Sequence, residues 1–150
     1  MTAPEQLTVL YDAECGFCRW SVARLLAADR AARLRPAAIQ SGEGEVLLAG
    51  MARGSWLASA HVVAPGGPVT SGGDAVAAIA AVLPGAAVTA PLARAAAPLS
   101  RAAYRLVAGN RITLGRLVSP GMRNAADERI AARRALVGWP LRRPGQQLEP

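Results

Sequence analysis

The sequence of 150 residues contains no lysine and only two cysteines, Cys15 and Cys18. Without lysine, the chain lacks the amine for Schiff-base chemistry and the lysine of a phosphate-binding P-loop. Two cysteines are too few for a secreted disulfide scaffold, an all-cysteine zinc site or an iron–sulfur cluster held by one chain. A chain of this length buries about two-thirds of its unfolded surface, so it can form a core without disulfide staples.

The sequence also lacks an unbroken apolar span. Residues 75–93 are uncharged, but Pro84 and Gly85 interrupt them, which favours two shorter helices over one membrane-spanning helix. The first seven residues lack the basic and apolar regions of a secretion signal. The sequence therefore predicts a cytoplasmic, thiol-reducing location, with peripheral contact to a membrane left open.

The basic residues, all of them arginine, are unevenly distributed. Residues 1–88 carry six arginines against seven acidic residues, whereas residues 89–150 carry eleven against three. The N-terminal part of the chain is therefore nearly neutral, and the C-terminal part is basic. We predict a core domain over residues 1–88, a basic helical extension over residues 89–137 and a disordered tail over residues 138–150.

The front of the chain is predicted to alternate strands and helices. Residues 7–11 are typical of a buried strand, and residues 16–30 carry the single apolar stripe of a helix. Pro36 confines the second strand to a sheet edge, because proline cannot donate to a ladder. The order β-α-β-α-β-β-α predicts an α/β fold with a C-terminal helical extension. The remaining predicted elements are a strand over 33–39, a helix capped by Ser41, a hairpin of strands over 60–64 and 68–70, a helix opened by a Ser71/Asp74 capping box, and helices near Leu92, over 99–108 and over 125–136.

Cys15 and Cys18 lie at the junction of the first strand and helix. Two residues three apart at a helix start share a face, so the thiols are close enough to form a disulfide. The helix N-terminus stabilises a thiolate on Cys15, whereas Cys18 falls on the apolar stripe. The pair therefore predicts a redox motif in which Cys15 attacks and Cys18 resolves. Arg19 would add a cation beside the thiolate, and Asp12 and Glu14 would oppose it.

A cysteine pair with this spacing can also serve in haem attachment, in a metal site or in a purely structural role. Haem attachment is excluded, because residue 19 is arginine where histidine is needed. A dimer sharing two pairs could bind one zinc ion, and two structural cysteines would have no chemistry at all. We expect neither a metal nor a cofactor.

The residues around the pair resemble a known family. Tyr11 to Cys18 (YDAECGFC) resembles the D-x-x-C-x-x-C signature of the DCC family of thiol-disulfide oxidoreductases, which is similar to thioredoxin in fold. Stretches at 39–41, 70–75 and 104–111 also resemble the family, so the likeness covers about residues 7–118. The resemblance implies disulfide reduction or exchange, with Asp12, Cys15 and Cys18 as site residues.

Asp12 and His61 each have two interpretations. Asp12 could cap the helix near Cys15, which we favour, or it could shuttle a proton to Cys18. A lone histidine such as His61 is more often a packed residue than a catalytic base.

The predicted function is reduction of a protein disulfide, with Phe17, Arg19 and Trp20 as candidate docking residues. The alternative is a binding module whose basic helices meet an anionic membrane surface or an acidic partner. Nucleic acid is not favoured, because Tyr104 is the one aromatic residue in that region. The arginines that would carry membrane binding are Arg94, Arg101, Arg105 and Arg111.

Overall fold

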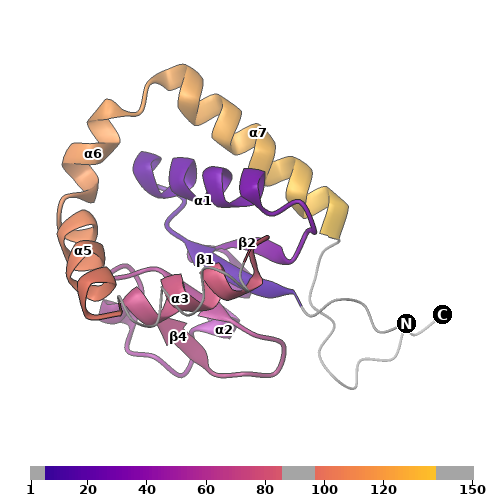
Figure 1. Cartoon of the computed structure of the whole chain (residues 1–150), viewed down its shortest axis with the longest axis vertical. Coiled ribbons are helices and arrows are strands. Elements are labelled where there is room, and N and C mark those ends of the chain that lie inside the picture. Colours follow the sequence, from indigo (N-terminus) through magenta and orange to yellow (C-terminus); the bar gives the residue numbers. More distant parts are fainter. Residues whose placement is uncertain (1–5, 86–96, 138–150) are drawn as a thin grey trace.

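The computed structural model of the protein describes residues 6–85 and 97–137 (Figure 1). Its strands form one mixed sheet in the order β2-β1-β3-β4, in which β1 pairs parallel with β2 and antiparallel with β3. Pro36 lies in the edge strand β2, as predicted. The strands are β1 (Leu7–Tyr11), β2 (Leu34–Ala38), β3 (His61–Val63) and β4 (Val69–Ser71).

The helices alternate with the strands and then continue alone. The observed order β1-α1-β2-α2-β3-β4-α3 confirms the predicted α/β, thioredoxin-like fold. The predicted helix near Leu92 and the predicted tail lie outside the described residues. The helices are α1 (Gly16–Ala28), α2 (Gly42–Leu47), the 3-10 turn η1 (Arg53–Ser55), α3 (Gly72–Val82), α5 (Ala97–Gly109), α6 (Arg111–Leu117) and α7 (Pro120–Val137).

The sheet separates two apolar clusters. Alternate residues of a strand point to opposite faces, so Val9 joins the larger cluster and Leu10 the smaller one. The larger cluster holds residues of α1 and α3 together with Ile130 of α7, and the smaller one holds Leu48 and Trp56. α1, whose start carries the cysteines, is thus packed on the larger cluster through Val22 and Leu26.

Helices α5, α6 and α7 follow one another around α1 (Figure 1). α5 packs on the start of α3 so closely that a Cβ on Gly73 would lie 2.7 Å from a side-chain carbon of Arg101. α7 packs along α1 and β2, where Arg133 pairs with the fully buried Asp29. None of the described helices is both long and apolar enough to span a bilayer.

Three details of the helices differ from the prediction. α6 is not among the predicted helices; it begins directly after its N-cap residue, Asn110. α7 begins at Pro120 rather than at residue 125, because Ser119 accepts a hydrogen bond from the Met122 N–H at 3.2 Å and proline fits the first helical position. The Ser71 capping box is wrong, since the Ser71 hydroxyl makes no cap hydrogen bond and lies 2.7 Å from His61 Nδ1.

Candidate functional site

Cys15 and Cys18 form a disulfide at the start of α1, with their Cα atoms 5.2 Å apart. Cys15 is the N-cap residue, and its Sγ accepts a hydrogen bond from the Cys18 N–H at 3.2 Å. The predicted placement of the pair at the strand-to-helix junction is therefore confirmed. Because the first N–H groups of a helix have no partner within it, a thiolate on Cys15 would replace one missing acceptor.

The loop between β1 and α1 is held in place by Gln40, which follows β2. The Gln40 side chain donates to Asp12 Oδ1 at 2.7 Å and accepts from the Ala13 N–H at 3.1 Å. Asp12 Oδ1 also accepts from the Glu14 N–H at 3.0 Å. Asp12 therefore closes a turn that ends at Glu14, one residue before the N-cap Cys15. Asp12 does not itself cap α1.

Cys15 lines an open groove of about 390 Å³ between the loop and α6. Arg123, from the first turns of α7, also lines this groove and lies next to Gly16. A Cβ on Gly16 would come within 3.3 Å of Arg123 Nε, so glycine there allows the guanidinium to approach the start of α1. The other residues that line the groove are Asp12, Glu14, Arg111, Ile112, Gly115 and Arg116.

Cys18 lines a different cavity, which has a volume of about 220 Å³. This cavity runs between α1, α3 and α5 down to β1, and its wall is mostly apolar. Leu57, Val76 and Val107 line it and are about 40% exposed, so its rim is both apolar and open to solvent. The two sulfur atoms of one disulfide thus adjoin different surroundings, cationic for Cys15 and apolar for Cys18.

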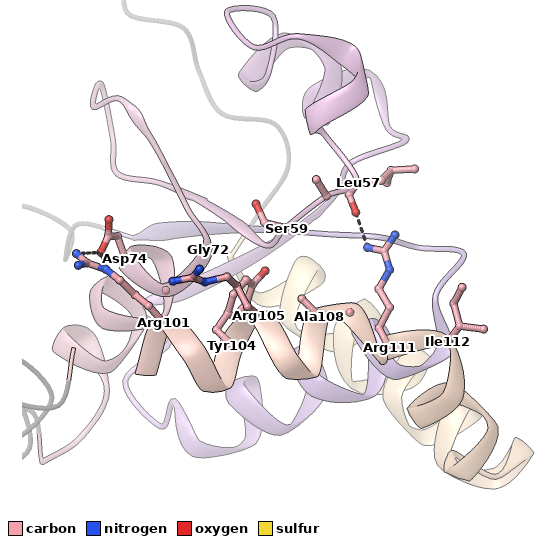
Figure 2. A pocket seen from close by; sticks show the side chains of 13 residues that line it. Leu57, Ser59, Gly72, Asp74, Arg101, Tyr104, Arg105, Ala108, Arg111 and Ile112 are labelled. Carbon is pink, nitrogen blue, oxygen red and sulfur yellow. Dashed lines mark hydrogen bonds and ion pairs between the residues drawn. The ribbon is translucent and has the colours of Figure 1, made fainter. Parts of the chain in front are cut away.

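Arg111 lies where these spaces meet. It lines the groove at Cys15, the apolar cavity and a third pocket of about 640 Å³ between α5 and the start of α3. Figure 2 shows this third pocket, with the Arg111 guanidinium donating to the carbonyl oxygen of Leu57. On its far side Arg101 pairs with Asp74 at 2.8 Å. Arg111 therefore ties α6 to the segment that precedes β3.

Two of the candidate docking residues, Phe17 and Trp20, lie together, whereas Arg19 is bound to α7. Phe17 lines the apolar cavity and contacts Trp20, with 5.9 Å between the ring centroids. Arg19 makes two hydrogen bonds to Asp127 of α7, at 2.8 and 3.1 Å, so its charge is compensated there. Of the arginines that would carry membrane binding, Arg94 lies outside the described residues.

His61 is fully buried in β3. Its Nε2 lies 3.0 Å from the Trp56 carbonyl oxygen and must donate to it, so Nδ1 accepts from the Ser71 hydroxyl. Both ring nitrogens are occupied, which supports the interpretation of His61 as a packed residue. In residues 6–85 and 97–137, no three histidine, cysteine or carboxylate side chains gather into a set that could hold a metal ion.

Sequence reasoning missed Gln40 and Arg123, and it gave Arg111 a different role. Gln40 lies within a stretch that the family resemblance marked, and its position just after β2 places it beside the end of β1 in a parallel pair. No comparable local signal marked Arg123, because its approach to Gly16 depends on how α7 packs.

A protein-family model described as DCC1-like thiol-disulfide oxidoreductase matches residues 9–117. The match covers most of β1, the cysteine pair and every later described element as far as α6. Searches of curated proteins and of solved structures found no match.

Proposed function

The chain belongs to the DCC1-like thiol-disulfide oxidoreductase family, and from this premise we propose that it reduces disulfides of protein substrates through Cys15 and Cys18. The observation that carries the proposal is the unequal setting of the two sulfur atoms, one at an open cationic groove and the other at an apolar cavity. The reductive direction follows from the expected cytoplasmic location, where the thiol pool favours reduction.

Cys15 acts as the nucleophile. The N-terminus of α1 and the nearby Arg123 guanidinium favour the thiolate of reduced Cys15. This thiolate attacks one sulfur of the substrate disulfide, forming a mixed disulfide and releasing the other substrate sulfur as a thiolate, which takes up a proton.

Cys18 completes the turnover. Its thiol loses a proton and attacks Cys15 Sγ, which releases the second substrate thiol and re-forms the Cys15–Cys18 disulfide. Asp12 lines the cavity that Cys18 adjoins, and it is the group we propose to accept that proton. Each cycle thus transfers two electrons from the dithiol to the substrate.

The substrate segment next to its reactive cysteine places an apolar side chain in the cavity beside Cys18. A cavity of about 220 Å³ that is lined by apolar residues and open at its rim suits one such side chain. Burial of an apolar group there brings the substrate disulfide to the cysteine pair and excludes water from it.

A redox titration tests the proposal directly. The wild-type protein is equilibrated in buffers of reduced and oxidised glutathione, and the Cys15–Cys18 disulfide is mapped by alkylation and mass. We expect a reversible two-electron transition and reduction of a protein disulfide that Cys15→Ser abolishes. In Cys18→Ser the mixed disulfide should accumulate, because nothing resolves it. Unchanged reduction in Cys15→Ser would exclude the proposal.

A matched pair of valine variants tests the docking cavity. Val76→Ser makes its rim polar, whereas Val46→Ser makes a similar change on the exposed surface of α2. We expect Val76→Ser to raise KM for a protein disulfide about 5-fold or more, since a buried apolar group contributes on the order of 1 kcal/mol or more. Exchange with a small thiol should be unchanged. Equal KM values for the two variants would refute the docking role.

A second candidate function is binding to an anionic membrane surface. Leu106, Ile112 and Leu117 are 69%, 75% and 75% exposed on α5 and α6, and Arg105 and Arg116 are exposed on the same helices. Apolar groups beside cations favour an interface with anionic lipid. We expect co-sedimentation with phosphatidylglycerol vesicles that Ile112→Ser weakens at unchanged charge. If Ile112→Ser and the wild type bind the vesicles equally well, the apolar residues do not contribute, and this second function is excluded.

A further inference from the structure

The three arginines that line the groove at Cys15 form no ion pair with a carboxylate of the described residues. Five arginines elsewhere in the described residues do form such pairs. In the groove, Arg123 donates instead to the carbonyl oxygens of Val118, at 3.1 Å, and Gly115, at 3.4 Å. Arg111 donates to another backbone carbonyl (Figure 2). The carboxylate pairs are Arg19–Asp127, Arg35–Glu43, Arg53–Glu45, Arg101–Asp74 and Arg133–Asp29.

The groove therefore keeps its positive charge. Arg116 is exposed and forms no hydrogen bond or ion pair with the described residues. Asp12 and Glu14 also line the groove, but they lie on the loop before Cys15, whereas the arginines lie on α6 and α7. Carbonyl groups do not cancel the charge of a guanidinium, so three cations face two carboxylates across the groove.

The size and position of the groove restrict what it can bind. About 390 Å³ falls in the range of roughly 300–1,000 Å³ that is typical of small-molecule sites. Cys15 lines this groove, whereas Cys18 lines the apolar cavity. A molecule in the groove thus meets the sulfur that is open to attack, and guanidinium groups that can each hold a carboxylate.

We infer that the groove binds a small thiol that carries carboxylates, such as glutathione, and that this thiol recycles the oxidised protein. The inference rests on the proposed function and identifies the chemistry of its reducing partner. The apolar cavity serves the protein substrate, and the cationic groove serves the reductant. Arg111, which lines both spaces, separates the two binding regions.

The reaction consumes two equivalents of the small thiol. The first, as a thiolate, attacks Cys15 Sγ, so a mixed disulfide forms and the Cys15–Cys18 bond breaks, leaving Cys18 to take up a proton. The second thiolate attacks the sulfur of the bound thiol and releases Cys15 as a thiolate, together with the small-molecule disulfide. Two electrons thus pass from the two thiols to the protein disulfide.

The test compares glutathione with its diester, in which both carboxylates are neutralised. The oxidised protein is mixed with each thiol at low ionic strength, quenched with an alkylating agent and analysed by mass. Rates are normalised to the concentration of thiolate, and dithiothreitol serves as a neutral reference. We expect glutathione to react about 5- to 10-fold faster than its diester, with the ratio falling at high salt.

Two arginine variants separate groove binding from the general charge of the protein. Arg116→Gln should lower the glutathione-to-diester ratio about 2- to 5-fold, which is typical of losing one exposed ion pair. Arg129→Gln removes an exposed charge of α7 that lines none of the three cavities, and should leave the ratio unchanged. The thiolate charge is common to both thiols, so the ratio reports on the carboxylates alone.

The outcomes distinguish this inference from the proposed function. If dithiothreitol still reduces the disulfide but the glutathione-to-diester rate ratio of the wild type is near one, the inference is overturned. It is equally overturned if Arg116→Gln and Arg129→Gln change that ratio to the same extent. The inference is also overturned if an acidic peptide without a thiol speeds reduction of the disulfide while glutathione and its diester react equally fast. A disulfide that dithiothreitol cannot reduce and an oxidant cannot re-form overturns both.

Discussion

Replacing Arg133 with methionine should destabilise the protein far more than replacing an exposed arginine such as Arg129. The Arg133 guanidinium makes four hydrogen bonds, to the Asp29 carboxylate and to the backbone carbonyls of Leu26, Asp29 and Leu34. These contacts join α7 to the end of α1 and the start of β2. Asp29 is fully buried and Arg133 is 11% exposed, so solvent does not replace the lost partner.

The expected magnitude follows from the charge that is left behind. Asp29 would keep its hydrogen bonds from the Arg33 and Leu34 N–H groups, at 3.0 and 2.7 Å, but would lose its cation. Removing one partner of a buried pair costs about 3–5 kcal/mol. For a chain of this size the melting temperature should fall by roughly 10 °C.

Urea unfolding followed by circular dichroism measures the effect, with Arg129→Met as the matched control on α7. The control removes an exposed arginine and should change the free energy of unfolding by no more than about 0.5 kcal/mol. Adding Asp29→Asn to Arg133→Met should recover part of the loss, because the unpaired charge is gone. A loss below about 1 kcal/mol for Arg133→Met would refute the argument that this pair anchors α7.

The remaining predictions concern the β2–α2 turn, α5 and the loop before Cys15. Gly44→Ala should lower the free energy of unfolding in urea by about 1–3 kcal/mol, because its Cβ would lie 2.3 Å from a backbone oxygen. Gly42→Ala has open space around its Cβ and should lower it far less, and equal losses would contradict the packing argument. Tyr104→Phe should cost about 1–2 kcal/mol, because the phenol oxygen accepts from the Ala60 N–H, and an unchanged stability would mean that water replaces it. Asp12→Asn keeps the Oδ1 acceptor and removes the base, so disulfide turnover should fall about 10-fold or more at unchanged stability, and wild-type turnover would exclude the proton shuttle.

The core of the fold could be predicted because its signals are local. The apolar run of β1, the proline in β2 and the Ser41 cap each point to one structure, and the Ser41 hydroxyl does accept from the Gly44 N–H at 3.1 Å. The cysteine pair was predictable for the same reason, since a spacing of three at a helix start determines its geometry.

What could not be predicted depends on contacts between distant segments. Ser71 carries the pattern of a helix cap, but the buried His61 ring takes its hydroxyl. Arg19 is four residues from Cys15 on the same helix, yet Asp127 lies within reach and binds it. In both cases a tertiary partner outweighs the local pattern, and the same packing brings Arg123 to the site.

The pairing of Arg133 with Asp29 also bears on the order in which the chain can fold during synthesis. The two residues are 104 positions apart, so Asp29 leaves the ribosome long before its cation does. Until residue 133 emerges, burying the end of α1 would enclose an uncompensated carboxylate, which opposes completion of the larger apolar cluster. Closing so long a loop is slow relative to forming α1 locally. α7 therefore completes the packing of α1, although about a hundred residues separate the two partners of this pair.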